Sequence, residues 1–123
     1  MNSELEIKWL SEPEEHNYPA AESYLSLIFD PITAADYVLK LRTAPVTDFK
    51  AKDILRASGL SPLGIINAHV EKDARKINEG QALSPLLLVR DKDNAKVIIV
   101  DGYHRMCSVY LLNEDATIPC KII

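Results

Sequence analysis

Residues 97–105 read Val-Ile-Ile-Val-Asp-Gly-Tyr-His-Arg, and this stretch contains the clearest local pattern of the chain. Its four leading apolar residues indicate a buried strand, and after Asp101-Gly102 the apolar spacing becomes helical up to about Leu112. A helix that starts directly after a strand leaves its first N–H groups unpaired, and Gly102 lets a ligand approach the backbone closely. The stretch therefore predicts a strand-to-helix turn that can bind an anion.

The side chains of the same turn are suited to phosphate chemistry. Arg105 and His104 supply donors, and a guanidinium can hold a phosphate through two hydrogen bonds. Asp101 can position a magnesium ion or accept a proton from a hydroxyl. We take Asp101 and His104 as candidate catalytic residues, and Gly102, Tyr103, His104 and Arg105 as candidate ligand-binding residues. The alternative is a structural turn in which Asp101 caps the helix and the side chains of His104 and Arg105 are solvated.

Strand patterns continue on both sides of this turn. Residues 85–90 form another apolar run, 91–94 a polar turn and 96–100 the returning strand, which together predict a β-hairpin. Residues 118–123 predict a last strand, in which Pro119 favours an edge position or the start of the strand. The last third of the chain is thus expected to contain a strand–helix–strand unit.

The first half of the chain has helical periodicity. Asp30-Pro31 ends one helix and opens the next, because aspartate favours the N-cap and proline the first turn. Gly59 and Gly80 stand where a helix favours a left-handed C-terminal residue, and Thr47 or Asp48 can cap the helix that precedes Gly59. The expected helices cover about residues 19–29, 31–44, 50–58 and 62–79.

Length and composition bound the architecture. A chain of 123 residues, 47% apolar and 26% charged, is typical of one globular domain. We expect an acidic N-terminal arm over residues 1–17, followed by a single domain over 18–123. The domain is expected to be α+β (α/β), with the N-terminal helices packed on a small mixed sheet.

Two features of the sequence bear on location. The longest apolar runs are four residues, against the ~20 needed to span a bilayer, so a membrane protein is excluded. The N-terminus has no basic segment followed by an apolar one, so a secretion signal is not indicated. We expect the protein in the cytoplasm.

Charge is distributed unevenly along the chain. Residues 1–30 hold seven acids and one base, although the net charge is only −4. This acidity argues against a protein that coats nucleic acid, whereas the excess of bases over acids between Lys40 and Lys76 favours a small anion. The bases expected to reach a phosphate at residues 101–105 are Lys52, Arg56, Arg75 and Lys76.

Cysteines and histidines do not have the spacing of a metal site, and no metal is predicted. We expect Cys107 and Cys120 to be reduced and buried, because a buried thiol behaves as a small apolar group. His69 is expected to be a half-buried structural histidine, and Trp9 to pack on the domain.

Three parts of the chain, residues 83–90, 99–105 and 118–122, together resemble the core of the ParB/sulfiredoxin superfamily. In that superfamily a proline-led strand, a hairpin and a strand ending in a short polar motif before a helix build a nucleotide site. The likeness covers roughly residues 77–123. It implies ATP, ADP or CTP with magnesium as candidate ligands.

The motif at residues 101–105 separates the branches of that superfamily. Sulfiredoxins carry their catalytic cysteine where Tyr103 stands, and Cys107 is out of register, so sulfinic-acid reduction is not expected. Partition proteins carry Gly-Glu-Arg-Arg and continue into a DNA-binding domain, whereas we expect this chain to stand alone. Free-serine kinases carry an Asp-Gly-His-His-Arg type motif, the most similar of the three. This likeness implies that Asp101 acts as a base or metal contact while His104 and Arg105 hold phosphate.

Several functions stay open at this point. One is a small-molecule kinase or nucleotide hydrolase; another is a non-catalytic nucleotide-sensing or protein-interaction module, whose acidic arm contacts a protein partner or another copy of the chain. Tyr103 either stacks on a base or covers the core.

DNA binding through residues 50–69 is less favoured, because Leu55 is too large for a helix-turn-helix and residues 62–66 offer nothing that reads bases. Nuclease activity is not expected either, since no carboxylate cluster is indicated.

Overall fold

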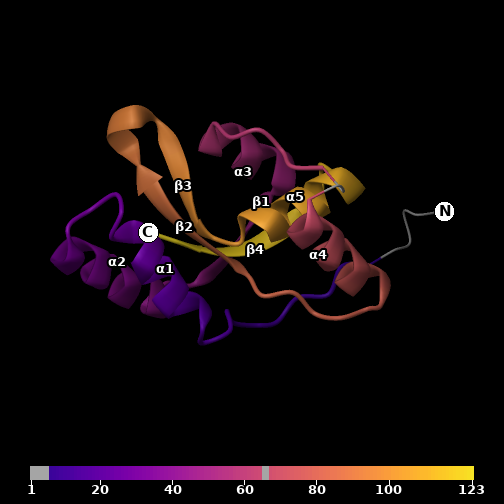
Figure 1. Ribbon diagram of the computed structural model, residues 1–123, viewed down its shortest axis with the longest axis horizontal. Coiled ribbons are helices and arrows are strands. Elements are labelled where there is room, and N and C mark those ends of the chain that lie inside the picture. The colour runs from indigo at the N-terminus through magenta and orange to yellow at the C-terminus, as the bar shows by residue number, and fades with distance from the viewer. Residues whose placement is uncertain (1–5, 65–66) are drawn as a thin grey trace.

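A four-stranded mixed sheet lies at the centre of this computed structural model, which describes residues 6–64 and 67–123 (Figure 1). The strand order is β1-β4-β2-β3, in which β4 pairs with β1 antiparallel and with β2 parallel, and β2 and β3 form an antiparallel hairpin. The strands are β1 (Val46–Lys50), β2 (Leu86–Asp91), β3 (Lys96–Asp101) and β4 (Thr117–Ile122).

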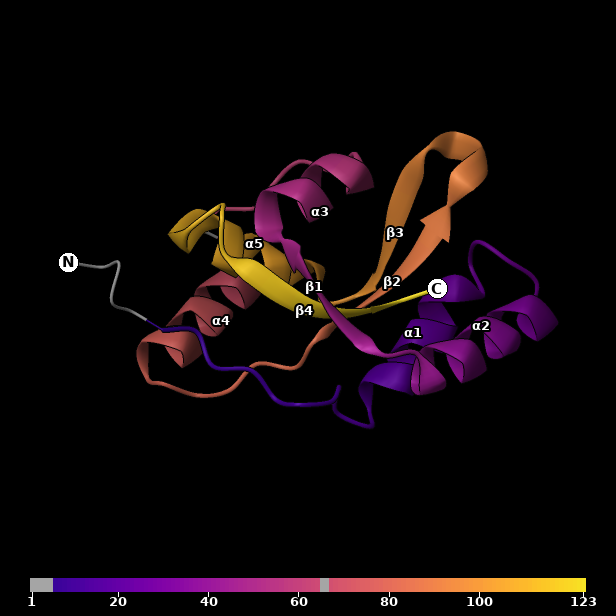
Figure 2. The same cartoon turned by 180° about the vertical axis from the view of Figure 1, so that it is seen from behind.

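Helices cover both faces of this sheet (Figures 1 and 2). Leu86 and Leu88 of β2 belong to a core shared with α3, α4 and α5, whereas Leu87 and Val89 belong to a core shared with α1 and α2. Burial on both faces explains why β2 is a continuous apolar run instead of an alternating one. The helices are α1 (Asn17–Leu25), α2 (Pro31–Thr43), α3 (Ala51–Ser58), α4 (Ala68–Asn78) and α5 (Tyr103–Leu112).

These elements confirm the expected α+β class, the hairpin and the strand–helix–strand unit. Asp30 caps α2 through the Thr33 N–H at 2.9 Å, with Pro31 in the first turn, as predicted. Cys107 and Cys120 are buried and unbridged, and Trp9 packs against the core. Among the described residues, no helix is long and apolar enough to cross a membrane.

Pro119 does not mark an edge strand, contrary to our expectation. β4 lies between β1 and β2, and Pro119 is its third residue. The parallel pairing with β2 begins only at Cys120, which lies opposite Leu86. Proline is tolerated inside the sheet because its missing N–H falls before the first bond of that pairing.

Two helix boundaries also differ from the prediction. Residues 46–50 form β1, so Thr47 and Asp48 lie in a strand and do not cap α3. The fourth helix starts at Ala68 instead of residue 62, because the Asn67 side chain accepts hydrogen bonds from the N–H groups of its first turn. Residues 65–66, which the prediction placed in this helix, lie outside the described residues.

The segment that precedes α1 packs along the domain. Trp9 forms a β-bridge with Leu83, where the Leu10 N–H donates to the Leu83 carbonyl at 2.8 Å. Further along, the Ser84 hydroxyl donates to the Asn17 side chain at 2.6 Å and accepts from the Glu14 N–H at 3.0 Å. The segment thus runs beside residues 83–84, which lead into β2.

Candidate functional site

A cavity of about 220 Å³ opens where α4 packs against the start of α5. Every residue of its lining except a glycine is charged or is a histidine. One wall comes from a single face of α4, and the other from the end of β3 and the first turn of α5. The lining residues are His69, Lys72, Asp73, Lys76, Asp101, Gly102, His104 and Arg105.

The start of α5, which contributes to the lining of this cavity, has backbone donors without a partner inside the helix. Gly102 is the N-cap and makes no side-chain cap hydrogen bond, and the Met106 N–H donates to the Gly102 carbonyl at 2.9 Å. The N–H groups of Tyr103, His104 and Arg105 precede that bond and have no acceptor within the helix. Such a helix start carries a partial positive charge and favours an anion.

Glycine is required at position 102 by conformation and by space. Its φ of +105° is one that residues with a side chain rarely adopt. A Cβ there would lie 2.8 Å from both Leu86 Cγ and Arg105 Nη2. The turn between β3 and α5 therefore keeps its shape only with glycine.

Arg105 fixes this turn to the start of β2. Its Nε donates to the Ser84 carbonyl at 2.9 Å, and its Nη2 donates to Asp101 Oδ2 at 3.0 Å and to the Pro85 carbonyl at 3.4 Å. Only 18% of each side chain of the Arg105–Asp101 pair is exposed. Arg105 thus lines the cavity mainly as a positioning residue, and Asp101 does not cap α5 and has one carboxylate oxygen bonded to Arg105.

His104 and His69 face each other across the cavity, with 4.8 Å between their ring centroids. Burial lowers the pKa of His104 below its ordinary value, and His69 and Arg105 lower it further, although the Asp73 carboxylate opposes them. These effects favour the neutral imidazole of His104, which can accept a proton. His69 is exposed and part of the cavity, so our expectation of a half-buried structural histidine is wrong.

Asp73 is the second acid of the cavity. Its residue is only 9% exposed, and its carboxylate makes no ion pair with any other residue that the structure describes. A buried carboxylate beside His104 stabilises the imidazolium, as the opposing effect on the histidine pKa indicates. Asp73 is thus placed to support a proton on His104.

Of the four bases expected near the phosphate, only Lys76 lines the cavity. The other three form ion pairs elsewhere: Arg75 with Glu71, Lys52 with Asp115 and Arg56 with Asp53. Lys72, one turn before Lys76 on the same face of α4, was missed. Residues 69, 72, 73 and 76 have the spacing that aligns side chains on one helix face, and this signal could have found them.

Tyr103 does not line the cavity. Its hydroxyl donates to the Ser61 carbonyl, and its ring packs against the core that contains α3, α4 and α5. The alternative in which Tyr103 covers the core therefore describes its place in this structure, and its side chain ties the start of α5 to the loop after α3.

Metal ligation is not favoured by the donor set of this cavity. Across the described ranges, 6–64 and 67–123, no group of three or more histidine, cysteine, aspartate or glutamate side chains is placed to hold a metal ion. Asp101, which the resemblance implies as a metal contact, already accepts from Arg105. Magnesium is often held by one or two carboxylates together with substrate phosphates, so any magnesium here would depend on the ligand.

Comparison with known proteins adds no relative. The chain matches no protein-family model. It matches no curated protein, and no solved structure matches it. The likeness to the ParB/sulfiredoxin superfamily stays a prediction, and function has to be argued from the geometry of the site.

Proposed function

We propose that this protein is a phosphate-binding domain whose ligand is the phosphate group of a small molecule, with nucleotides among the candidates. The observation that carries the proposal is that Lys72, Lys76 and the N-terminal turn of α5 line one cavity. Ammonium groups and helix N-termini are both recurrent phosphate donors, and here they come from two packed helices. Neither lysine forms an ion pair with another described residue.

The size of the cavity limits what it can enclose. Its volume of about 220 Å³ is below the roughly 300–1,000 Å³ of pockets that surround a drug-sized ligand. A phosphate group fits inside, whereas the rest of the molecule extends out of the opening. If the ligand is a nucleotide, its base therefore lies on the surface around the cavity.

Phosphoryl transfer or hydrolysis is the second candidate function, and His104 favours it. A catalytic base needs a free acceptor beside the phosphate, and the lowered pKa of His104 provides one. Asp101 is less suited to that role because Arg105 occupies its carboxylate. Binding without turnover needs only the lysines and the helix start.

A thermal-shift panel tests the proposal. Orthophosphate, pyrophosphate, ADP, ATP and CTP are each added with and without magnesium to the wild type, to Lys76→Gln and to Arg75→Gln. A ligand at ~100 times its dissociation constant should stabilise the wild type by about 2.7 kcal/mol, or several degrees. We expect Lys76→Gln to lose most of this shift. Arg75→Gln should keep it, because Arg75 lies next to Lys76 in sequence but outside the cavity.

Two results would contradict the proposal: no shift with any of these anions, or equal loss in Arg75→Gln and Lys76→Gln. Release of orthophosphate from pyrophosphate or a nucleotide in the same samples separates phosphoryl chemistry from binding alone.

Affinity should also depend on pH through His104. A bound anion favours the imidazolium and raises the pKa that burial lowers in the free protein. Binding should therefore strengthen as the pH falls from about 8 to about 5, by up to roughly tenfold for each unit of pKa change. Sulfate is the suitable probe, because it stays doubly charged over this range. His104→Gln should flatten the dependence, whereas His16→Gln, outside the cavity, should not.

The lowered pKa of His104 has a second consequence, in the protein without ligand. The folded state takes up a proton on this group less readily than the unfolded state, so the contribution of His104 to stability is lost as the pH falls below the ordinary histidine range. The thermal shift that sulfate causes is therefore measured at each pH against unliganded protein at the same pH. An affinity for sulfate that is constant over this range would contradict a role of His104 in binding.

A further inference from the structure

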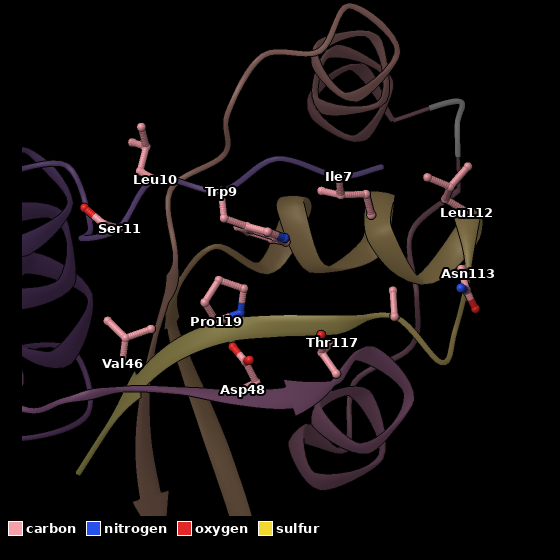
Figure 3. A pocket seen from close by; sticks show the side chains of 11 residues that line it. Ile7, Trp9, Leu10, Ser11, Val46, Asp48, Leu112, Asn113, Thr117 and Pro119 are labelled. Atoms are coloured by element: carbon pink, nitrogen blue, oxygen red, sulfur yellow. The ribbon is translucent and has the colours of Figure 1, made fainter. Parts of the chain in front are cut away.

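A second cavity, of about 750 Å³, lies over β1 and β4 (Figure 3). It shares no residue with the cavity between α4 and α5. Val46 and Lys121 are opposite each other in the sheet, and the Lys121 ammonium donates to the Arg42 carbonyl of α2 at 2.7 Å. This cavity thus occupies the same sheet face as α2, beyond the area that the helix covers. We call it the β1 groove.

The walls of the β1 groove combine apolar and polar residues, with one charge. Trp9 and Leu10 of the N-terminal segment form one side, and Val46 and Pro119 belong to the sheet. In Figure 3, Trp9 and Asp48 lie on opposite sides of Pro119. Asp48 is the one ionisable side chain among the described lining residues and makes no ion pair with a described residue. A ligand that fills the groove therefore meets an aromatic ring and a carboxylate that has no ion-pair partner among the described residues.

The groove borders an open strand edge. Among the residues that the structure describes, β1 is the outermost strand and pairs with β4 alone, on one side (Figure 2). The Ala51 N–H donates to the Ala116 carbonyl at 2.9 Å, just beyond the pairing of Phe49 with Ile118. Because bonding alternates along an antiparallel pair, residues 47 and 49 bond to β4, and the N–H and C=O groups of residues 46, 48 and 50 point away from it. Such an edge can accept another strand.

We propose that the β1 groove binds an extended peptide segment of a partner protein, which pairs with β1 as a fifth strand and places a lysine or arginine side chain against Asp48 and Trp9. Main-chain groups of the open edge provide the hydrogen bonds of such a complex, and alternate side chains provide its specificity. A cation opposite Asp48 gains from the carboxylate and from the indole ring. An apolar residue two positions away in the peptide lies opposite Val46.

This proposal selects one occupant from the chemistry of the groove. An acidic peptide would bring like charge to Asp48, and a wholly apolar peptide would leave that carboxylate without a partner. A free amine of small size would use Asp48 and Trp9 but not the edge of β1. The edge and the groove together therefore favour a basic residue within an extended chain.

Selection from a displayed library of random heptapeptides tests the proposal with the full chain. The library is selected on the wild type, and a synthetic copy of the enriched peptide is then measured against Asp48→Lys and Asp93→Lys. Asp93 is an exposed carboxylate on the β2–β3 turn, outside the groove, and its substitution changes the net charge equally. Circular dichroism and thermal unfolding verify that both variants are folded.

We expect the enriched peptides to carry lysine or arginine with an apolar residue two positions away. Asp48→Lys should weaken the synthetic peptide at least about tenfold, whereas Asp93→Lys should not. Alternate backbone amides of the peptide point to opposite sides of its strand, so only one set faces β1. Methylation of the set that faces β1 should abolish binding, whereas methylation of the other set should leave it unchanged. Three results would overturn the proposal. The enriched peptides could lack a basic residue, or the synthetic peptide could bind Asp48→Lys as tightly as the wild type. The third is full displacement of the peptide by n-butylamine together with no effect of amide methylation.

Discussion

Gly102→Ala should lower the free energy of unfolding by about 3 kcal/mol, since an unfavourable φ costs roughly 1–3 kcal/mol and overpacking of a core a similar amount. The φ of +105° is unfavourable for alanine, and the new Cβ would lie 2.8 Å from Leu86 Cγ. Leu86 is fully buried and cannot move aside without disturbing the core. Urea unfolding at equilibrium measures the change.

Gly64→Ala is the matched control for this prediction. Gly64 has no positive φ, and a Cβ there would meet nothing within 4 Å. Its substitution should change stability by no more than about 0.5 kcal/mol, as is usual at open surface positions. Equal stability of the two variants would show that the turn between β3 and α5 does not have the conformation described.

Replacing Lys72 and Lys76 together by glutamate should weaken orthophosphate and pyrophosphate binding by about 100-fold or more. Each substitution removes one charge-assisted hydrogen bond, worth roughly 1.5–3 kcal/mol, and adds a repulsive carboxylate. The fold should persist, because neither lysine forms an ion pair with another described residue and Lys72 is exposed. Isothermal titration of the folded variant measures the loss.

The effect of the changed net charge has to be separated from the effect of the lost contacts in the cavity. Lys92→Glu with Lys96→Glu changes the total charge by the same amount at the β2–β3 turn, outside the cavity. Affinity for phosphate in that variant should fall only slightly, and less as salt is added. Equal loss in the two double variants would place the anion somewhere other than between α4 and α5.

The parts of the fold that the sequence predicted best are those with a continuous or strictly spaced pattern. The runs at residues 86–89 and 97–100 indicated the hairpin because strands buried on both faces are apolar throughout. β1 was missed because its partly buried residues, Val46 and Phe49, are three positions apart, a spacing that fits one face of a helix and not the alternation of a strand. Ser61-Pro62 has the signature of a helix start, yet Asn67 makes the cap, since its side chain is placed to accept from the first turn.

Of the two walls of the candidate site, only the one at residues 101–105 was predicted, and the reason is again physical. The turn at residues 101–105 carries a local signal, because a strand, a glycine and a helix follow one another in the chain. The α4 wall depends on which helix packs against α5, and local spacing cannot indicate that contact. Arg105 could not be assigned correctly from sequence either, since its acceptors, the Ser84 and Pro85 carbonyls, are distant in the chain.

A titration of ¹⁵N-labelled protein with pyrophosphate shows directly whether a phosphate group binds between α4 and the start of α5. Two-dimensional amide spectra report each backbone N–H separately. Binding at this place should produce saturable shifts that are largest at residues 103–105 and on α4 around Lys72 and Lys76, with the indole N–H of Trp9 unchanged. Spectra that do not change at millimolar pyrophosphate, or shifts that cluster away from these two helices, would contradict it.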